Sequence, residues 1–114
     1  MIGIFLDDER DPEDVYWVAY PDVQWYTLTN AKDFMHCVSL VTSDDEFVVS
    51  FDHDIQSYLP NGDEQTGYDC LKYLIDLCME KGYSIPKCFF HTQNPVGKVN
   101  MESYYNNAIK FIGE

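Results

Sequence analysis

The sequence contains two short apolar runs, each of which ends abruptly in aspartates. The first run, Ile2–Leu6, leads into Asp7–Arg10, and the second, Phe47–Phe51, leads into Asp52–Asp54. Short apolar runs rich in β-branched and aromatic residues are typical of strands buried on both faces of a parallel sheet, although periodicity alone also admits a buried helix. Because ligands bind beyond the carboxyl ends of such strands, both acidic segments are expected at one edge of a parallel sheet.

Paired carboxylates at that edge predict a cation site. Two neighbouring strands would bring four carboxylates to one rim, where they repel one another unless protons or a cation lie between them. Hard divalent cations such as Mg²⁺ or Mn²⁺ prefer such oxygen ligands. The expected metal ligands are Asp7, Asp8, Asp52 and Asp54. The alternative is that these are ordinary acids of solvated loops, and the second pair in a matching position weakens that alternative.

Composition limits the classes of partner and the compartment. The 114 residues predict a single domain, 1–114, and 46% apolar residues suffice for a hydrophobic core. The net charge of −13 repels phosphate backbones, so long duplex nucleic acid is not an expected partner, whereas a small phosphate ligand bridged by a metal is compatible. No apolar run is long enough for a membrane span and no signal segment precedes the first strand, so we expect a cytoplasmic protein without membrane contact. The oligomeric state is left open.

Periodicity and capping residues predict the remaining elements. After the first strand, at most a short turn and no helix is expected between Pro12 and Pro21. The aromatic residues of 15–26 are expected to fill a core or cover a sheet edge, or else to stack on a nucleobase. The elements that come next are a strand over 23–28, a helix from Thr29 or Asn30 to Val41, a helix capped by Thr66 that stops at Gly82, a strand over 87–91, a rim loop over 91–97 and a helix capped by Asn100.

This order predicts an α/β fold with a four-stranded parallel sheet. Right-handed crossovers favour the strand order 2-1-3-4, with three helices distributed over the faces of the sheet.

Four motifs follow one another through nearly the whole chain and resemble those of a known family. They are Leu6–Arg10, Ser50–Asp54, Thr66–Asp69 and His91–Gly97, the last followed by Asn100 and Met101. In these motifs the chain resembles the receiver-like family named for cyclic-phosphate processing. The resemblance implies a receiver-like, flavodoxin-like three-layer sandwich. It also implies a phosphoesterase that acts on a cyclic phosphate of a nucleotide or an RNA end, in RNA repair or in cyclic-nucleotide signalling and anti-defence.

The residues of these motifs suit that chemistry. A guanidinium such as that of Arg10 can bind phosphate oxygens bidentately, or else pair with Asp8 or Glu9. A histidine can protonate the leaving oxygen, and His91 is favoured over His53 because polar side chains follow it. Either histidine can instead be a hydrogen-bonded residue at a strand end. The expected catalytic residues are His91, His53, Arg10 and Asp8, and the expected substrate contacts are Arg10, Thr66, Thr92, Asn94 and Gly97.

Two other classes of protein remain open at this point. A phospho-accepting receiver needs a lysine at the end of its last strand, but Lys87 stands at the start of the last predicted strand and Lys98 directly follows the rim loop. A non-catalytic module that sequesters a nucleotide or a partner protein fits the same residues, and the high acidity also admits a nucleic-acid mimic. The sequence therefore leaves enzyme and binding module as alternatives.

Overall fold

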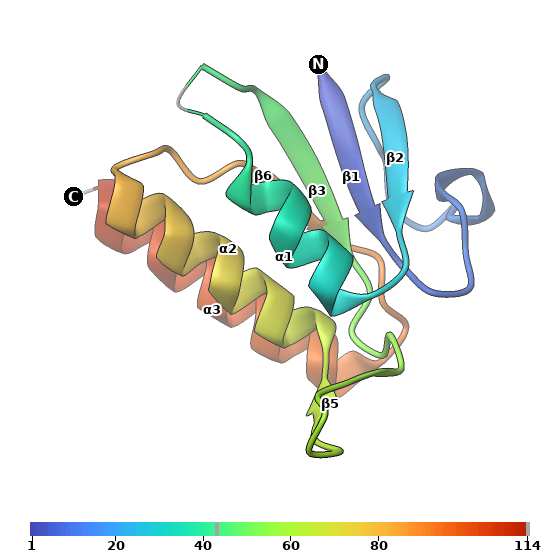
Figure 1. The fold of residues 1–114 in the computed structure, drawn as a ribbon. Helices are drawn as coiled ribbons and strands as arrows, with labels where there is room; N and C mark the ends of the chain where they lie inside the picture. Colours follow the sequence, from blue (N-terminus) through green and yellow to red (C-terminus); the bar gives the residue numbers. More distant parts are fainter. Residues whose placement is uncertain (43, 114) are drawn as a thin grey trace.

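Apolar strands and capped helices alternate along the chain and build a four-stranded parallel sheet with helices packed against it (Figure 1). The computed structural model describes residues 1–42 and 44–113. The strands of this sheet are β1 (Ile2–Leu6), β2 (Gln24–Leu28), β3 (Phe47–Phe51) and β6 (Lys87–Phe90). The helices are α1 (Ala31–Ser39), α2 (Gly67–Lys81) and α3 (Pro95–Gly113). The sheet order is β2-β1-β3-β6, which confirms the predicted order and the α/β architecture.

The register of the sheet brings three strand ends to the same level. Leu6 of β1 pairs with Phe51 of β3, and Phe51 pairs with Phe90 of β6. Beyond these pairs, the backbone N–H of Asp52 donates to the carbonyl of Leu6 (2.9 Å), and that of His91 donates to the carbonyl of Phe51 (3.1 Å). The residues that follow the three strands are therefore neighbours.

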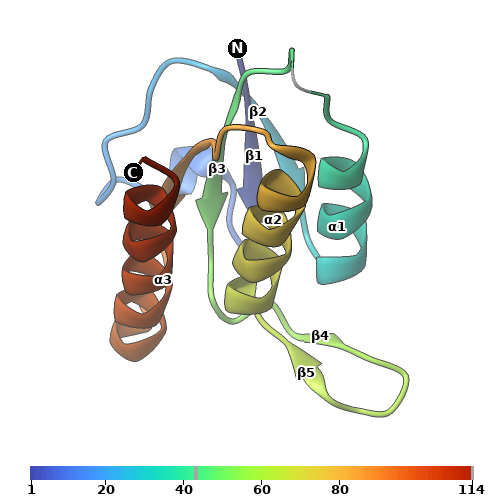
Figure 2. The same cartoon turned by 90° about the vertical axis from the view of Figure 1, so that its left-hand side faces the viewer.

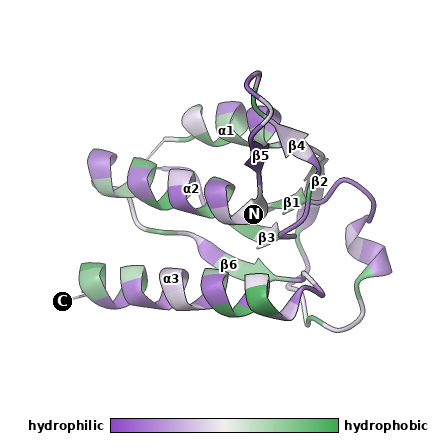
Figure 3. Cartoon of the chain, turned by 90° about the horizontal axis from the view of Figure 1, so that it is seen from below, coloured by the Kyte–Doolittle hydropathy of each residue, from purple (hydrophilic) through white to green (hydrophobic). Residues whose placement is uncertain are grey.

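All three helices of the described residues cover one face of the sheet (Figure 3). Apolar side chains such as Phe34 of α1, Leu74 of α2 and Met101 of α3 belong to one buried cluster with Leu6 and Phe51. The expectation that the helices are distributed over both faces is wrong. Right-handed crossovers place consecutive helices on one face when the chain moves in one direction across the sheet, as it does from β2 to β3 to β6. Only the β1–β2 connection runs the other way, and it contains no α-helix.

Residues 11–23 form a layer over the opposite face of the sheet. This segment contains a short 3₁₀ helix, η1 (Pro12–Asp14), and is otherwise irregular. Tyr20 packs edge-on against Phe5 of β1 and Trp25 of β2. Tyr20 thus covers this sheet face, which fits the core-filling interpretation of the sequence, whereas Tyr16 is exposed.

Helix α3 begins earlier than the sequence predicted. Asn100 was expected to cap it, but the helix starts at Pro95, and the side-chain carbonyl of Asn94 accepts the backbone N–H of Gly97 (3.1 Å). Proline suits the first helical position because its missing N–H would have no partner there. The rim loop therefore ends at Asn94, and Gly97 belongs to the helix.

Local capping explains the other two helices. Asn30 accepts the backbone N–H of Asp33 (2.8 Å) at the start of α1, and Thr66 and Asp69 form the predicted capping box of α2. Gly82 ends α2 with a φ of +69°, a conformation that favours glycine.

Among the described residues, no helix has both the length and the apolar character that a membrane crossing requires.

The loop that was expected to border the site contains a small hairpin. Strands β4 (Ser57–Tyr58) and β5 (Glu64–Gln65) pair antiparallel and project away from the body of the protein (Figure 2). Only the start of this loop, at Gln56, lies at the cavity described below.

Candidate functional site

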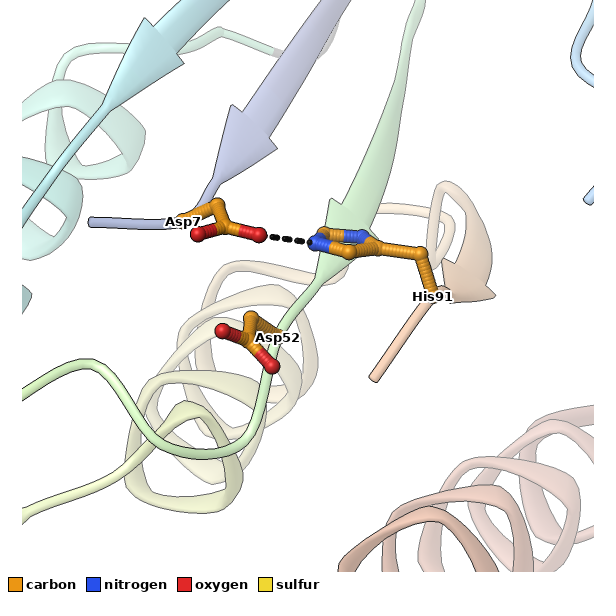
Figure 4. A group of neighbouring side chains, drawn as sticks. All are labelled: Asp7, Asp52 and His91. Atoms are coloured by element: carbon orange, nitrogen blue, oxygen red, sulfur yellow. Dashed lines mark hydrogen bonds and ion pairs between the residues drawn. The ribbon is translucent and has the colours of Figure 1, made fainter. Parts of the chain in front are cut away.

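Three buried side chains converge where β1, β3 and β6 end (Figure 4). Asp7, Asp52 and His91 are the first residues after these strands, and successive residues of a strand alternate between faces, so the level register sends all three side chains to the face covered by residues 11–23. They are only 1%, 7% and 0% exposed. One ligand atom from each lies within 4.8 Å of the other two. We call these three residues the rim cluster.

The His91 ring extends across β3 towards β1. Its Nε2 lies 2.9 Å from Oδ2 of Asp7, and its face stacks on Phe5 with ring centroids 4.3 Å apart. The small side chain of Ser50 leaves room for this path and places its Oγ 2.7 Å from Nδ1 of His91. The indole N–H of Trp17 donates to the His91 carbonyl (2.8 Å), so the backbone is held as well as the ring.

Asp7 is held by four N–H groups in total. Its Oδ1 accepts the backbone N–H groups of Glu9 (2.8 Å) and Arg10 (3.0 Å), which shapes the turn after β1. Its Oδ2 faces His91 and, at 3.5 Å, Nη1 of Arg10. Burial by itself would raise the pKa of Asp7, but the hydrogen bond from His91 and those from the two backbone groups outweigh it and lower the pKa.

Asp52 has the opposite electrostatic environment. Its Oδ1 accepts the backbone N–H of His53 (2.8 Å). Burial raises the pKa of Asp52, and the negative charge of nearby Asp7 raises it further. A cation between the two carboxylates would remove this repulsion, so the rim cluster has the charge and the donor atoms of a metal site. Two carboxylates and one imidazole are ligands that Mn²⁺ and similar divalent ions accept.

A polar cavity of about 220 Å³ opens beside the rim cluster. Its lining consists of Glu9, Arg10, Asp52, Asp54, Gln56, Thr92, Gln93 and Asn94. Arg10 is the one cationic side chain in this lining, and its Nη2 donates to the side-chain carbonyl of Gln93 (3.2 Å). Its guanidinium also lies over the Trp17 ring, 5.6 Å from the centroid. The ion pair of Arg10 is with Asp7 and not with Asp8 or Glu9, the partners that the sequence had suggested.

His53 forms a second polar group at the edge of this cavity. Its Nδ1 lies 2.9 Å from Oδ1 of Asp54, and the amide N–H of Asn94 donates to the other Asp54 oxygen (3.1 Å). The hydrogen bond from His53 lowers the pKa of Asp54. The His53 side chain is 18% exposed, and its Nε2 makes no hydrogen bond to any residue that the structure describes.

The predicted site residues separate into two groups. Arg10, Asp52, Asp54, Thr92 and Asn94 line the cavity. The other predicted residues do not line the cavity. Among them, Asp8 is half-buried and belongs neither to the cavity lining nor to the rim cluster. Asp54 lies in the cavity wall, bonded to His53, and not in the rim cluster.

Thr66 and Gly97, both expected as substrate contacts, have structural contacts instead. The Thr66 hydroxyl lies 3.3 Å from Asp69 within the cap of α2. Gly97 packs under the His53 ring, where an added Cβ would lie 2.5 Å from Cγ of that ring. Gly97 therefore makes room for His53 and does not line the cavity.

Sequence reasoning missed three residues that hold the rim cluster in place: Ser50, Tyr20 and Trp17. Ser50 had a detectable signal, because it is a polar residue in an apolar strand and lies two positions before Asp52, on the same face. Tyr20 and Trp17 come from an irregular segment whose contacts depend on the tertiary fold, and no local pattern identifies them.

Comparison with known proteins gives one match. A scan against protein-family models matches residues 2–107 to the cyclic-phosphate processing receiver domain. A search of curated proteins and a search of solved structures found no match to the chain.

Proposed function

The chain belongs to the cyclic-phosphate processing receiver domain family, and on that premise we propose that it is a metal-dependent phosphoesterase acting on a cyclic phosphate of a nucleotide or an RNA end. One observation carries the proposal. The buried rim cluster of Asp7, Asp52 and His91 adjoins a polar cavity, and Asp52 belongs to both. The two carboxylates and the imidazole can together bind a cation, and the arginine in the cavity wall can bind phosphate oxygens. This combination is suited to a phosphate ester.

Asp7, Asp52 and His91 would hold the divalent cation. Mg²⁺ prefers a shell of oxygen ligands, whereas Mn²⁺ also accepts an imidazole, so the presence of His91 favours Mn²⁺ over Mg²⁺. Such an ion supplies charge neutralisation at the phosphate and lowers the pKa of a bound water.

The cavity is suited to the phosphate end of a substrate. Its volume of about 220 Å³ is below the roughly 300–1,000 Å³ of pockets that enclose a whole drug-sized ligand. A cyclic phosphate with part of its ribose fits this space, and the base then stays outside. The Arg10 guanidinium would bind the phosphate oxygens, and the Asn94 side chain lies in the same wall.

His53 is a better candidate for the proton donor than His91. His91 is fully buried and both of its ring nitrogens have partners, whereas His53 is partly exposed and its Nδ1 is oriented by Asp54. In this role His53 acts as the imidazolium, with Nδ1–H donated to Asp54 and a second hydrogen on Nε2. Nε2 gives its proton to the ester oxygen as the bond from that oxygen to phosphorus breaks, and the water that attacks phosphorus supplies the new P–OH group and releases its other proton to solvent.

The test is a panel of 2′,3′-cyclic and 3′,5′-cyclic mononucleotides and oligonucleotides, incubated with Mg²⁺ or Mn²⁺ and resolved by chromatography. We expect a phosphomonoester product from at least one of them, more with Mn²⁺ than with Mg²⁺, and none with a chelator. Tight binding without product from any compound would instead support a sequestering module.

Matched variants locate the activity. Asp52→Asn should abolish turnover, whereas Asp76→Asn, at an exposed aspartate of α2, should not change it. His53→Gln should slow turnover by about 10²–10⁴-fold if His53 is the general acid. His36→Gln is the control for a histidine lost from an exposed position. Full activity in His53→Gln would remove His53 from the mechanism.

A further inference from the structure

A chain of hydrogen bonds runs from the rim cluster through the sheet to the layer formed by residues 11–23. Oδ2 of Asp7 lies 2.9 Å from Nε2 of His91, Nδ1 of His91 lies 2.7 Å from Oγ of Ser50, and that Oγ lies 2.5 Å from the hydroxyl of Tyr20. Asp7, His91 and Ser50 are at most 1% exposed, whereas Tyr20 is half-buried. The first three members of the chain are thus shielded from water, and Tyr20 is its outer end.

The proton positions in this chain follow from its inner end. Ionised Asp7 can only accept, so Nε2 of His91 must carry the hydrogen that lies between them. A neutral imidazole then has its lone pair on Nδ1, so the Ser50 hydroxyl must donate to it. The Ser50 oxygen in turn accepts the hydroxyl hydrogen of Tyr20. Each of these groups has a partner, in agreement with the lack of unpaired buried side-chain polar atoms among the described residues.

The same chain of hydrogen bonds can also run in the opposite direction, because the hydroxyls of Ser50 and Tyr20 can each donate and accept. If Nε2 of His91 presents its lone pair to a cation, Nδ1 carries the hydrogen and donates to Ser50. Ser50 then donates to the Tyr20 oxygen, and the Tyr20 hydroxyl donates to water. Tyr20 is half-buried and lines an open cavity of about 610 Å³, which brings water to its side of the molecule.

The reversal is balanced in protons. The imidazole, the serine and the tyrosine hold three exchangeable hydrogens in either direction. One hydrogen leaves Nε2 and one enters at the Tyr20 oxygen, so no net charge is created in the interior. Burial raises the pKa of Tyr20 to about 12, so this hydroxyl remains protonated at neutral pH.

We propose that Ser50 and Tyr20 are positioning residues that can pair with Nδ1 of His91 whether this nitrogen bears the lone pair or the hydrogen. In the metal-free protein Asp7 holds Nε2–H and Ser50 donates to Nδ1, and Ser50 and Tyr20 reverse their donor direction when a divalent cation occupies the rim cluster. The second part rests on the proposed metal site, and the first part does not. The ligand that causes this reversal is a divalent cation that accepts an imidazole nitrogen.

Nitrogen-resolved NMR of the full chain, labelled with ¹⁵N-histidine, tests the resting state. The ring nitrogens that bear hydrogen and those that bear a lone pair give distinct signals, and single substitutions of His36 and His53 assign the signals of His91. We expect Nε2–H and a bare Nδ1 for His91 without metal. A hydrogen on Nδ1 with a bare Nε2 would overturn the assignment.

Titration with a diamagnetic probe, Zn²⁺ alone or Mg²⁺ alone, tests the reversal. We expect the hydrogen of His91 to move from Nε2 to Nδ1 as the cation binds. Binding measured by calorimetry without any change at His91 would overturn the reversal while leaving a cation site at the carboxylates. Absence of any binding would overturn the proposed metal site and the reversal together, and the signals of the metal-free protein would still decide the resting state.

Tyr20→Phe separates the two directions of the chain. It leaves Ser50 able to donate to His91, so the metal-free signals should be unchanged. In the reversed direction it removes the acceptor of the buried Ser50 hydroxyl, so Zn²⁺ should bind on the order of tenfold more weakly. Tyr26→Phe, at an exposed tyrosine of β2, is the matched control and should bind as the wild type does. Equal affinity in the Tyr20→Phe and Tyr26→Phe variants would exclude a positioning role for Tyr20.

Discussion

At the scale of single residues, Asp7 and Asp52 are two buried carboxylates with opposite environments. Burial raises the pKa of both, but Asp7 has hydrogen bonds from His91 and two backbone groups that more than compensate. Asp52 has one backbone donor from His53 and faces the charge of Asp7. The metal-free protein therefore keeps a carboxylate at position 52 at a cost in stability, which is expected where a residue serves binding.

Asp52→Asn should accordingly raise the Tm of the metal-free protein by a few degrees, because the amide has nearly the same shape and no charge. The raised pKa of Asp52 means that the folded state binds its proton more tightly than the unfolded state. The Tm difference between variant and wild type should therefore be largest above that raised pKa, and should shrink as the pH falls through it towards the ordinary value of 3.8. Calorimetry across this pH range measures the difference.

Asp76→Asn is the control for loss of a charge at an exposed site, and its Tm should stay close to that of the wild type. A lower Tm for Asp52→Asn at neutral pH would contradict this expectation, because it would show that the Asp52 carboxylate stabilises the metal-free fold.

At the scale of elements, the start of α3 links helix formation to the site. Asn94 caps this helix through its Oδ1 and at the same time donates from Nδ2 to Asp54 in the cavity wall. Gly97, in the first turn of the helix, leaves the space that the His53 ring occupies. The early start of α3 is therefore what brings Asn94 and Gly97 to His53 and Asp54.

Asn94→Ala should lower stability and disturb the site, whereas Asn30→Ala should only lower stability. Both asparagines cap a helix and both donate to an aspartate, Asn30 to Asp33 (2.9 Å) and Asn94 to Asp54 (3.1 Å). Loss of either cap should cost about 1 kcal/mol in the free energy of unfolding, measured by urea denaturation. Only Asn94→Ala should shift the ring-nitrogen signals of His53. Unchanged His53 signals in that variant would mean that Asn94 does not help to position the His53–Asp54 pair.

At the scale of the whole molecule, the two faces of the sheet are covered in different ways. One face carries α1, α2 and α3, and the other carries the irregular layer of residues 11–23 (Figure 3). The rim cluster lies on the second face, so its environment depends on side chains of that layer such as Trp17 and Tyr20. The whole chain also carries a net charge of −13, which opposes the compact state through self-repulsion.

Salt should therefore stabilise the metal-free protein. Raising the ionic strength from about 0.01 M to about 0.15 M shortens the Debye length from roughly 30 Å to roughly 8 Å, so repulsion between distant acids is screened. We expect the Tm to rise by a few degrees, measured by circular dichroism. NaCl and KCl should act alike, which separates screening from the binding of a particular cation. A Tm that falls with salt would indicate that attractive ion pairs outweigh the excess of negative charge.

Local sequence patterns predicted the four strands of the sheet, the three α-helices and their order. The β-branched and aromatic runs predicted the strands, Asn30 and the Thr66–Asp69 capping box predicted two helix starts, and Gly82 predicted a helix end. These signals act between residues a few positions apart, so they can be recognised without a structure. The strand order and the family were predicted as well, and both are confirmed.

Which of the polar residues meet depends on packing between distant segments, and the structure was needed to show it. It placed His91 with Asp7 and Asp52 while Asp8 and Asp54 lie apart from them, and it added Ser50 and Tyr20 behind His91. These groups come from segments up to 84 positions apart in the chain. Their convergence depends on the register of three strands and on the face to which each side chain points, and local sequence patterns specify neither because both are set by packing between distant segments.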